Sequence, residues 1–162
     1  MNKSICVDLE ELLPVIEEKL SNGGTFMFSP KGESMLPTIR PNIDSVTVSP
    51  VADRLEKYDL PLYRRDNGQF VIHRVISVKK NSYVMCGDNQ VIPEYNISDR
   101  HIIGIVTSIH RPDKIISVTD EEYLKYVRSH VKKQRKIGIL FLFKRKIKRK
   151  LIKMHILKGA KD

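Results

Sequence analysis

The sequence contains no tryptophan, only two cysteines and no long hydrophobic run. Cys6 and Cys86 belong to no spaced cluster, so they indicate neither a disulfide framework nor a metal motif, and we expect no cofactor. The best apolar segment, residues 137–143, is seven residues long, whereas a span of the bilayer needs ~18. An acidic run follows Lys3 where a leader peptide would have an apolar segment. We therefore expect no transmembrane anchor, and either a peripheral membrane location or a cytoplasmic one.

Acidic residues are scarce in only one part of the chain. The net charge is +10, but residues 132–162 hold 13 of the 29 lysines and arginines and a single acid, Asp162. Residues 1–131 carry a small net negative charge. The basic character therefore belongs to a C-terminal tail and not to the main domain.

The tail has a pattern typical of a basic amphipathic helix. No glycine or proline occurs between residues 139 and 158, and Leu140, Ile147, Leu151 and Met154 share one helical face among cations. Such helices lie on anionic membrane surfaces, so we expect residues 132–158 to bind one. A nucleic-acid backbone or an acidic protein would use the same charges, and a solvated tail is the plain alternative. We favour the membrane because the interleaved residues are large aliphatics and phenylalanine.

The rest of the chain predicts a mainly β protein. Residues 7–21 have helical apolar spacing, with Asp8 and Glu11 as a capping box and Pro14 as a complication. Short strands are expected at residues 25–28, 45–48, 60–64, 69–78, 82–86, 101–110 and 114–118. The turn 66–68 predicts a hairpin. We expect an N-terminal helix (1–24), a core of coiled, antiparallel, barrel-like sheet (25–118) and a basic helical tail (119–162).

Ser34 lies in an unusual local setting. Gly32 precedes it by two residues and allows positive φ and close backbone approach. Pro37 follows it by three and pushes Leu36 into an extended conformation. A serine held on a stiff turn suits a nucleophile, which needs a base held against its hydroxyl. An ordinary tight turn would explain this stretch alone equally well.

Two further stretches carry residues that complete such chemistry. His73 follows Ser34 by 39 residues within a strand, and Asp88 follows His73 by 15 within Gly-Asp-Asn. Taken singly, His73 is a core histidine on a valine-rich strand face, and Asp88 is a turn former. Their order along the chain is serine, then histidine, then aspartate, and three stretches in a set order are more specific than any one of them.

The three stretches together resemble a known family. The matching residues are those of a Gly-x-Ser-Met-x-Pro box, a strand with the general base, and a Gly-Asp-Asn box: Gly32, Ser34, Met35, Pro37, 71–78, Gly87, Asp88 and Asn89. They resemble the serine peptidase superfamily that holds type I signal peptidases and LexA-type self-cleaving repressors, over residues 25–110. Most bacterial members have a lysine as base, so His73 makes the chain similar to the endoplasmic-reticulum and archaeal type.

The resemblance implies the coiled β fold of that superfamily and a serine endopeptidase. Ser34 would attack the peptide carbonyl, His73 would take its proton, and Asp88 would orient the imidazole. The backbone N–H of Ser34 is the expected first oxyanion donor. A second donor cannot be named, because Gly32 offers no side chain there.

The remaining matched residues, Gly32, Met35, Pro37 and Asn89, would support the turn or the substrate. The resemblance also implies the substrate, a peptide or preprotein that binds as an added strand and is cleaved after small residues. Without a membrane anchor, trimming of leader peptides from small ribosomal products fits better than processing of secreted preproteins.

Some positions depart from the family pattern. The glycines expected before Asp44 and Asp59 are missing, with Asn42 and Tyr58 in those turns. Glu94 stands where the family has a second aspartate, which leaves open the acid that orients His73. An alternative function is a non-catalytic or self-cleaving regulator that binds nucleic acid or an acidic partner through its tail. Only about 24 residues precede the core, too few for a DNA-binding helix pair. The sequence leaves the oligomeric state open.

Overall fold

The computed structural model describes residues 9–159, and side chains up to residue 149. Helix α1 (Leu9–Ser21) opens this part, and it contains Pro14. Its Ile16 and Leu20 are buried, in line with the predicted apolar face. Gly23, with φ of 76°, follows the helix as a left-handed terminator. The expected capping residue Asp8 lies outside the described residues.

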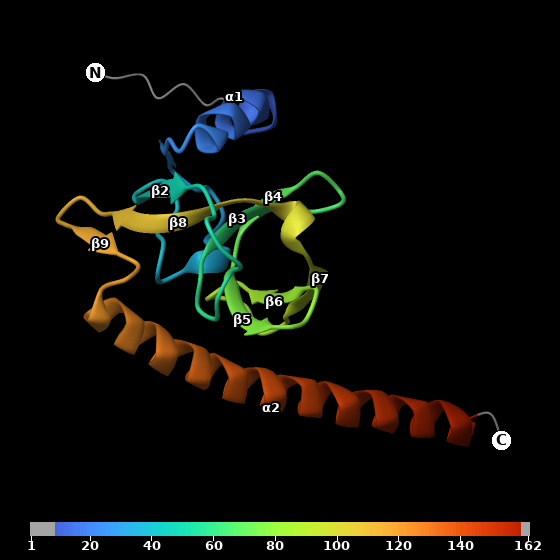
Figure 1. Ribbon diagram of the computed structural model, residues 1–162. Coiled ribbons are helices and arrows are strands. Elements are labelled where there is room, and N and C mark those ends of the chain that lie inside the picture. The colour runs from blue at the N-terminus through green and yellow to red at the C-terminus, as the bar shows by residue number, and fades with distance from the viewer. Residues whose placement is uncertain (1–8, 160–162) are drawn as a thin grey trace.

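The core is a curled antiparallel half-barrel of two sheets (Figure 1). The larger sheet has the order β1-β2-β8-β3-β4, with β9 also paired to β8. Its strands are β1 (Phe26–Phe28), β2 (Ser45–Ser49), β3 (Pro61–Arg64), β4 (Phe70–Ile72), β8 (Ile102–His110) and β9 (Ile115–Ser117). The smaller sheet has the order β5-β6-β7, from β5 (Arg74–Val78), β6 (Tyr83–Cys86) and β7 (Glu94–Ile97). The predicted mainly β class with a helix at each end is confirmed.

The strand expected at residues 69–78 is in fact two strands. β4 pairs with β3 in the larger sheet, through the predicted hairpin, and β5 pairs with β6 in the smaller one. The chain changes sheets at His73, which belongs to neither strand. The single long strand was therefore wrong, and β7 was not expected. The switch places His73 at the junction of the two sheets.

Two apolar clusters fill the fold. One lies under the larger sheet and α2, around Val46, Val106 and Val127, which are fully buried. The other joins the larger sheet to the smaller one, around Tyr63, Val75 and Met85. Because strands from both sheets contribute to the second cluster, His73 and its neighbours are held by packing on both sides.

Helix α2 (Glu121–Gly159) is one continuous helix of 39 residues. Its first half packs on the core, where Tyr123, Val127 and Val131 are buried. Figure 1 shows its later half running on beyond the half-barrel. Among the residues 9–159, no helix has the length and apolar content to cross a bilayer.

Candidate active site

Ser34 lies on a single turn of 3-10 helix, η1 (Glu33–Met35), which follows edge strand β1. Met35 is buried and anchors the turn in the core, and Leu36 is extended as predicted, with φ of −61° and ψ of 144°. Gly32 is also extended, with φ of −82°, and a Cβ there would meet nothing within 4 Å. Gly32 therefore uses neither the positive φ nor the close backbone approach that a glycine allows.

The tight approach occurs instead at Gly87. A Cβ on Gly87 would lie 2.6 Å from the carbonyl oxygen of Ser34 and 3.1 Å from Cδ2 of His73. The Ser34 backbone and the His73 ring are thus no farther apart than the sum of these two distances. Only glycine leaves room for this meeting. Residues 39 positions apart in the sequence are brought together at the Gly-Asp-Asn turn.

The opposite edge of the His73 ring faces an acid through a tyrosine. The Tyr63 hydroxyl lies 3.1 Å from Nδ1 of His73 and donates to Oε2 of Glu94 at 2.8 Å. Oε2 of Glu94 itself is 3.6 Å from Nδ1. Arg65 holds the carboxylate with bonds of 2.7 and 2.6 Å to its two oxygens. Strands β3 and β7 therefore supply the groups around Nδ1.

The protonation states in this network follow from its partners. Burial would raise the pKa of Glu94, but hydrogen bonds from Arg65 and Tyr63 outweigh it and lower the pKa, so the carboxylate is ionised. Burial, with the bond to Glu94, raises the pKa of Tyr63 and keeps its O–H. Since that O–H is given to Glu94, the tyrosine oxygen is left to accept Nδ1–H from His73. This tautomer leaves Nε2 with its lone pair, beside the Cδ2 edge that faces Ser34.

His73 is suited to be a base rather than a cation. It is 3% exposed. Burial, reinforced by the charge of Arg65, lowers its pKa to about 4. Neutral imidazole is the form that accepts a proton. The part of the chain that the structure describes shows no hydrogen bond between the Ser34 hydroxyl and His73, and contacts of this kind are often longer before substrate binds.

Asp88 is paired with Arg74 rather than with His73. Both side chains are 1% exposed, and Arg74 donates to Oδ1 at 2.8 Å and to Oδ2 at 2.6 Å. Thr38 also donates to Oδ2. Nδ1 of His73 has Tyr63 and Glu94 beside it, the second acid that the sequence left open. The orienting role expected of Asp88 thus has no hydrogen bond in its support within residues 9–159.

Helix α2 braces the Gly-Asp-Asn turn from beneath. Gln134 donates from Nε2 to the carbonyl oxygens of Gly87 and Gln90, at 2.6 Å each. His130 Nε2 lies 2.9 Å from the carbonyl oxygen of Asp88. The hydroxyl of Tyr123, also on α2, accepts a hydrogen bond of 3.2 Å from Arg74. The helix therefore holds the same turn that separates Ser34 from His73.

The turn is also tied directly to the serine loop. The backbone N–H of Asn89 donates to the Ser34 carbonyl at 2.8 Å, and its side chain donates to the Glu33 carbonyl at 3.3 Å. Asn89 therefore links the Gly-Asp-Asn turn to the loop that Met35 anchors in the core. Pro37 is exposed just beyond the loop.

Two turns in which the resemblance leads us to expect a glycine adopt the left-handed backbone without one. Tyr58 has φ of 87° and Asn42 has φ of 59°. The Tyr58 carbonyl accepts a bond of 3.0 Å from Arg74, so its left-handed turn is part of the support of the buried ion pair. The surrounding contacts hold Tyr58 in a conformation that costs a tyrosine about 1–3 kcal/mol.

Cys86 is a buried structural residue. Burial raises the pKa of its thiol to about 11, and its sulfur lies against backbone carbonyls and Gln134. No cluster of three or more potential metal ligands occurs among the described residues. A thiol in this state is a poor nucleophile.

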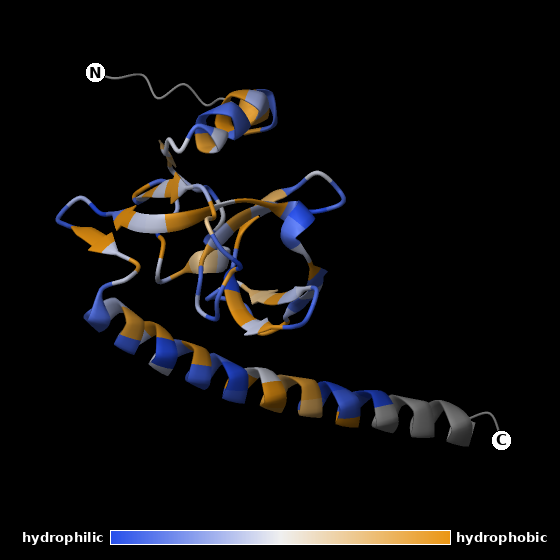
Figure 2. Ribbon diagram, viewed as in Figure 1, coloured by the Kyte–Doolittle hydropathy of each residue, from blue (hydrophilic) through white to orange (hydrophobic). Residues whose placement is uncertain are grey.

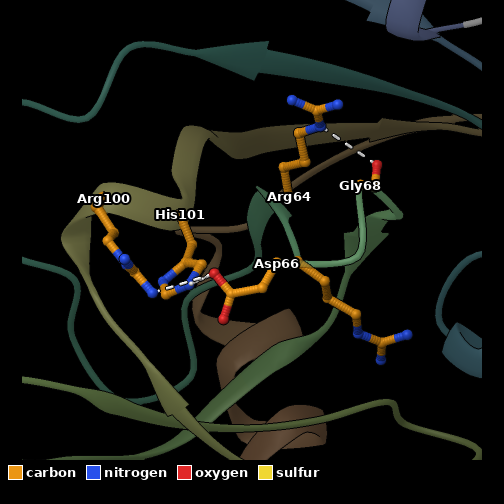
Figure 3. Close-up of a pocket in the computed structure, with 6 residues that line it drawn as sticks. Arg64, Asp66, Gly68, Arg100 and His101 are labelled. Carbon is orange, nitrogen blue, oxygen red and sulfur yellow. Dashed lines mark hydrogen bonds and ion pairs between the residues drawn. The ribbon is translucent and has the colours of Figure 1, made fainter.

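A polar hollow of about 300 Å³ lies near Arg65, at the rim of the network (Figure 3). Figure 3 shows Asp66 pointing toward Arg100 and His101, which it contacts at 3.0 and 3.2 Å. Arg64 pairs with Glu10, and Arg65 with Glu94. The arginines that line the hollow are thus already paired with acidic residues of the chain. Neither Ser34 nor His73 lines the hollow.

Sequence reasoning missed the groups that act at a distance from the motifs. These are the buried Arg74 partner, the Tyr63 bridge, and the two helix residues His130 and Gln134. The available signals were the arginine that directly follows His73 and the acid Glu94 after Gly-Asp-Asn. No protein-family model matches this chain, and no curated protein matches it.

Proposed function

We propose that this protein is a serine endopeptidase with the signal peptidase/LexA-like fold, in which Ser34 is the nucleophile and His73 the general base. The observation that carries the proposal is the position of the His73 ring. One edge, Cδ2, lies at the Gly87 gap beside Ser34, and the other, Nδ1, meets Tyr63 and Glu94. A general base needs these two distinct neighbours, a nucleophile and an orienting acid.

In the proposed reaction, Nε2 of His73 takes the proton of Ser34 Oγ as the oxygen attacks the carbonyl carbon of the peptide. The imidazolium then gives that proton to the leaving amine, and water hydrolyses the acyl-enzyme by the same path. Ionised Glu94, acting through the Tyr63 hydroxyl, stabilises the imidazolium. The backbone N–H of Ser34 is the first donor to the oxyanion.

The peptide would bind as an added strand. β1, which leads into Ser34, and β5, which follows His73, are both edge strands of their sheets in the described part of the chain. The outer edge of β5 is partly covered, because Val75 exchanges backbone hydrogen bonds of 2.8 and 2.9 Å with Tyr58 and Asp59. The outer edge of β1 therefore suits an extended peptide better, whose main chain gives affinity while side-chain pockets give specificity. A peptide or preprotein leader is the proposed substrate class.

The decisive test uses a fluorophosphonate probe, which labels activated serines, and a peptide library read by mass spectrometry. We expect wild type to be labelled once, at Ser34, and to cleave peptides after small residues. Ser34→Ala and His73→Gln should lose both activities. Ser82→Ala and His110→Gln are the matched controls and should keep both. Cleavage or labelling that persists in Ser34→Ala would leave the non-catalytic or regulatory alternative.

A further inference from the structure

Helix α2 packs on the core over its first half, and the described side chains of its second half are exposed. Val131 and Gln134 are buried against the core. Gly138 is buried too, and a Cβ added to it would lie 3.1 Å from the carbonyl oxygen of Val91. From residue 139 to residue 149 every side chain is exposed. The helix therefore leaves the half-barrel just after the residues that brace the site turn.

The exposed half begins with a band of large apolar side chains, residues 137–143. Six of its seven residues are leucine, isoleucine or phenylalanine, and Ile139 and Phe143 are 67% and 61% exposed. Figure 2 shows this band as an orange stretch of α2 between blue ones. Seven consecutive residues point to all sides of a helix, so the helix surface is apolar nearly all the way round over this short cylinder. Exposed apolar area of this kind marks an interaction site.

Cations flank the band on both sides. Four lie in residues 132–136 and five in residues 144–149, and no acid occurs between Glu122 and Asp162. Neighbouring turns of the helix therefore provide no carboxylate to pair with them. The partner must accept apolar side chains and positive charge within a few turns of one helix.

We propose that residues 132–149 of α2 bind the surface of an anionic lipid bilayer. Lipid accepts both features: the band enters the headgroup and acyl boundary while the flanking lysines and arginines stay with the lipid phosphates. The band is about 10 Å long at 1.5 Å per residue, so the cations on either side of it can reach lipid phosphates of the same surface. A second copy would bring the same charge and cover one side of the cylinder. A nucleic acid would leave its phenylalanines and leucines in water.

The bound segment and the site brace are one helix, which fixes the site near the bilayer. Only six residues, about 9 Å of helix, separate Gln134 from Leu140. The Gly87–Asn89 turn held by Gln134 is therefore kept close to the lipid surface. Resting on the proposed peptidase function, this assigns peptides adsorbed on or emerging from an anionic membrane as the substrate class.

The absence of tryptophan permits a direct binding test. Phe141→Trp places the sole indole in the band, and Ile115→Trp places it on β9, at another exposed apolar residue. We expect a blue shift only for Phe141→Trp, and only with vesicles of phosphatidylcholine and phosphatidylglycerol in equal parts. Vesicles of phosphatidylcholine alone should give none. A shift in neither protein, or equal shifts in both, would overturn the proposal.

Sedimentation with the same vesicles measures the two contributions. Leu140→Ser with Phe143→Ser should weaken binding about tenfold or more, and each of Lys144→Gln, Arg145→Gln and Lys146→Gln about fivefold at low salt. The control Ile115→Ser should bind as wild type. Band-dependent self-association without vesicles would favour a second copy. Binding of duplex DNA that survives the Leu140 and Phe143 changes, with no vesicle binding, would favour nucleic acid; either result overturns the proposal.

Ser34→Ala separates this proposal from the peptidase function. It should bind anionic vesicles as tightly as wild type while losing fluorophosphonate labelling. Vesicle binding with no labelling of wild type would remove the peptidase function alone. Labelling of wild type without vesicle binding would remove the membrane proposal alone.

Discussion

Replacing Asp88 by asparagine tests whether this residue supports the fold or the chemistry. The change keeps the shape of the side chain but leaves Arg74, itself 1% exposed, as a buried charge without its carboxylate. Breaking a buried ion pair in this way costs about 3–5 kcal/mol. For a chain of this length that lowers Tm by roughly 10 °C. We therefore expect Asp88→Asn to be strongly destabilised.

Glu94→Gln should behave in the opposite way. Glu94 and Arg65 are 24% and 28% exposed, so their pairing contributes only about 1 kcal/mol. The change removes the charge that stabilises the His73 imidazolium, so the rate of fluorophosphonate labelling should fall about tenfold or more. The quantity that changes thus separates the two acids: Asp88 mainly affects stability, and Glu94 mainly affects the labelling rate.

Urea unfolding followed by circular dichroism gives both free energies of unfolding, with unchanged m-values as the check on two-state behaviour. The double variant Arg74→Met, Asp88→Leu is the control, because an apolar pair removes both buried charges and should recover most of the stability. A folded Asp88→Asn within about 1 kcal/mol of wild type but without labelling would refute this assignment. Asp88 would then be the catalytic acid.

Three further outcomes follow from the same site. Burial lowers the pKa of His73 to about 4, so the labelling rate should fall as the pH drops through about 4. In the unfolded chain the same imidazole is protonated near pH ~6.5, so the free energy of unfolding should fall by roughly 3 kcal/mol between pH ~6.5 and 4. Urea titrations of His73→Gln should not show this loss. Tyr63→Phe should shift the His73 tautomer, read from ring ¹⁵N chemical shifts, and slow labelling; an unchanged tautomer would contradict the bridge. Gly87→Ala should cost about 1–3 kcal/mol and abolish labelling, since its Cβ would meet the Ser34 carbonyl at 2.6 Å, whereas Gly32→Ala should unfold at the wild-type urea concentration.

Local patterns predicted both helices, most of the strands and the hairpin of β3 and β4, but not how the strands divide between two sheets. The period of residues 69–78 is continuous across His73, so nothing in it reports that β4 and β5 join different sheets. Such a switch is decided by pairing with distant strands. β7 is short and mostly polar or exposed, so it lacked the apolar alternation that marks a strand.

The site was predictable to the extent that motifs fix backbone proximity. Ser34 and His73 were named from order and spacing, and the structure places them on either side of Gly87. The hydrogen-bond partner of Asp88 depends on the side of the turn toward which its carboxylate points. That choice is made by Arg74, whose burial cannot be read from an arginine in an alternating strand. The spacing of motifs along the sequence thus indicates which segments meet. The direction of a side chain within them depends on the packing of the whole core.

The brace by α2 has a consequence for the order in which the protein is made. Ribosomes complete the segment with Ser34, His73 and Gly87 before they add the helix that carries His130 and Gln134. Until that helix docks, the carbonyls of the turn lack these partners. Under the proposed peptidase function, hydrolytic activity would then arise only late in synthesis, which would protect the nascent chain and its neighbours from cleavage.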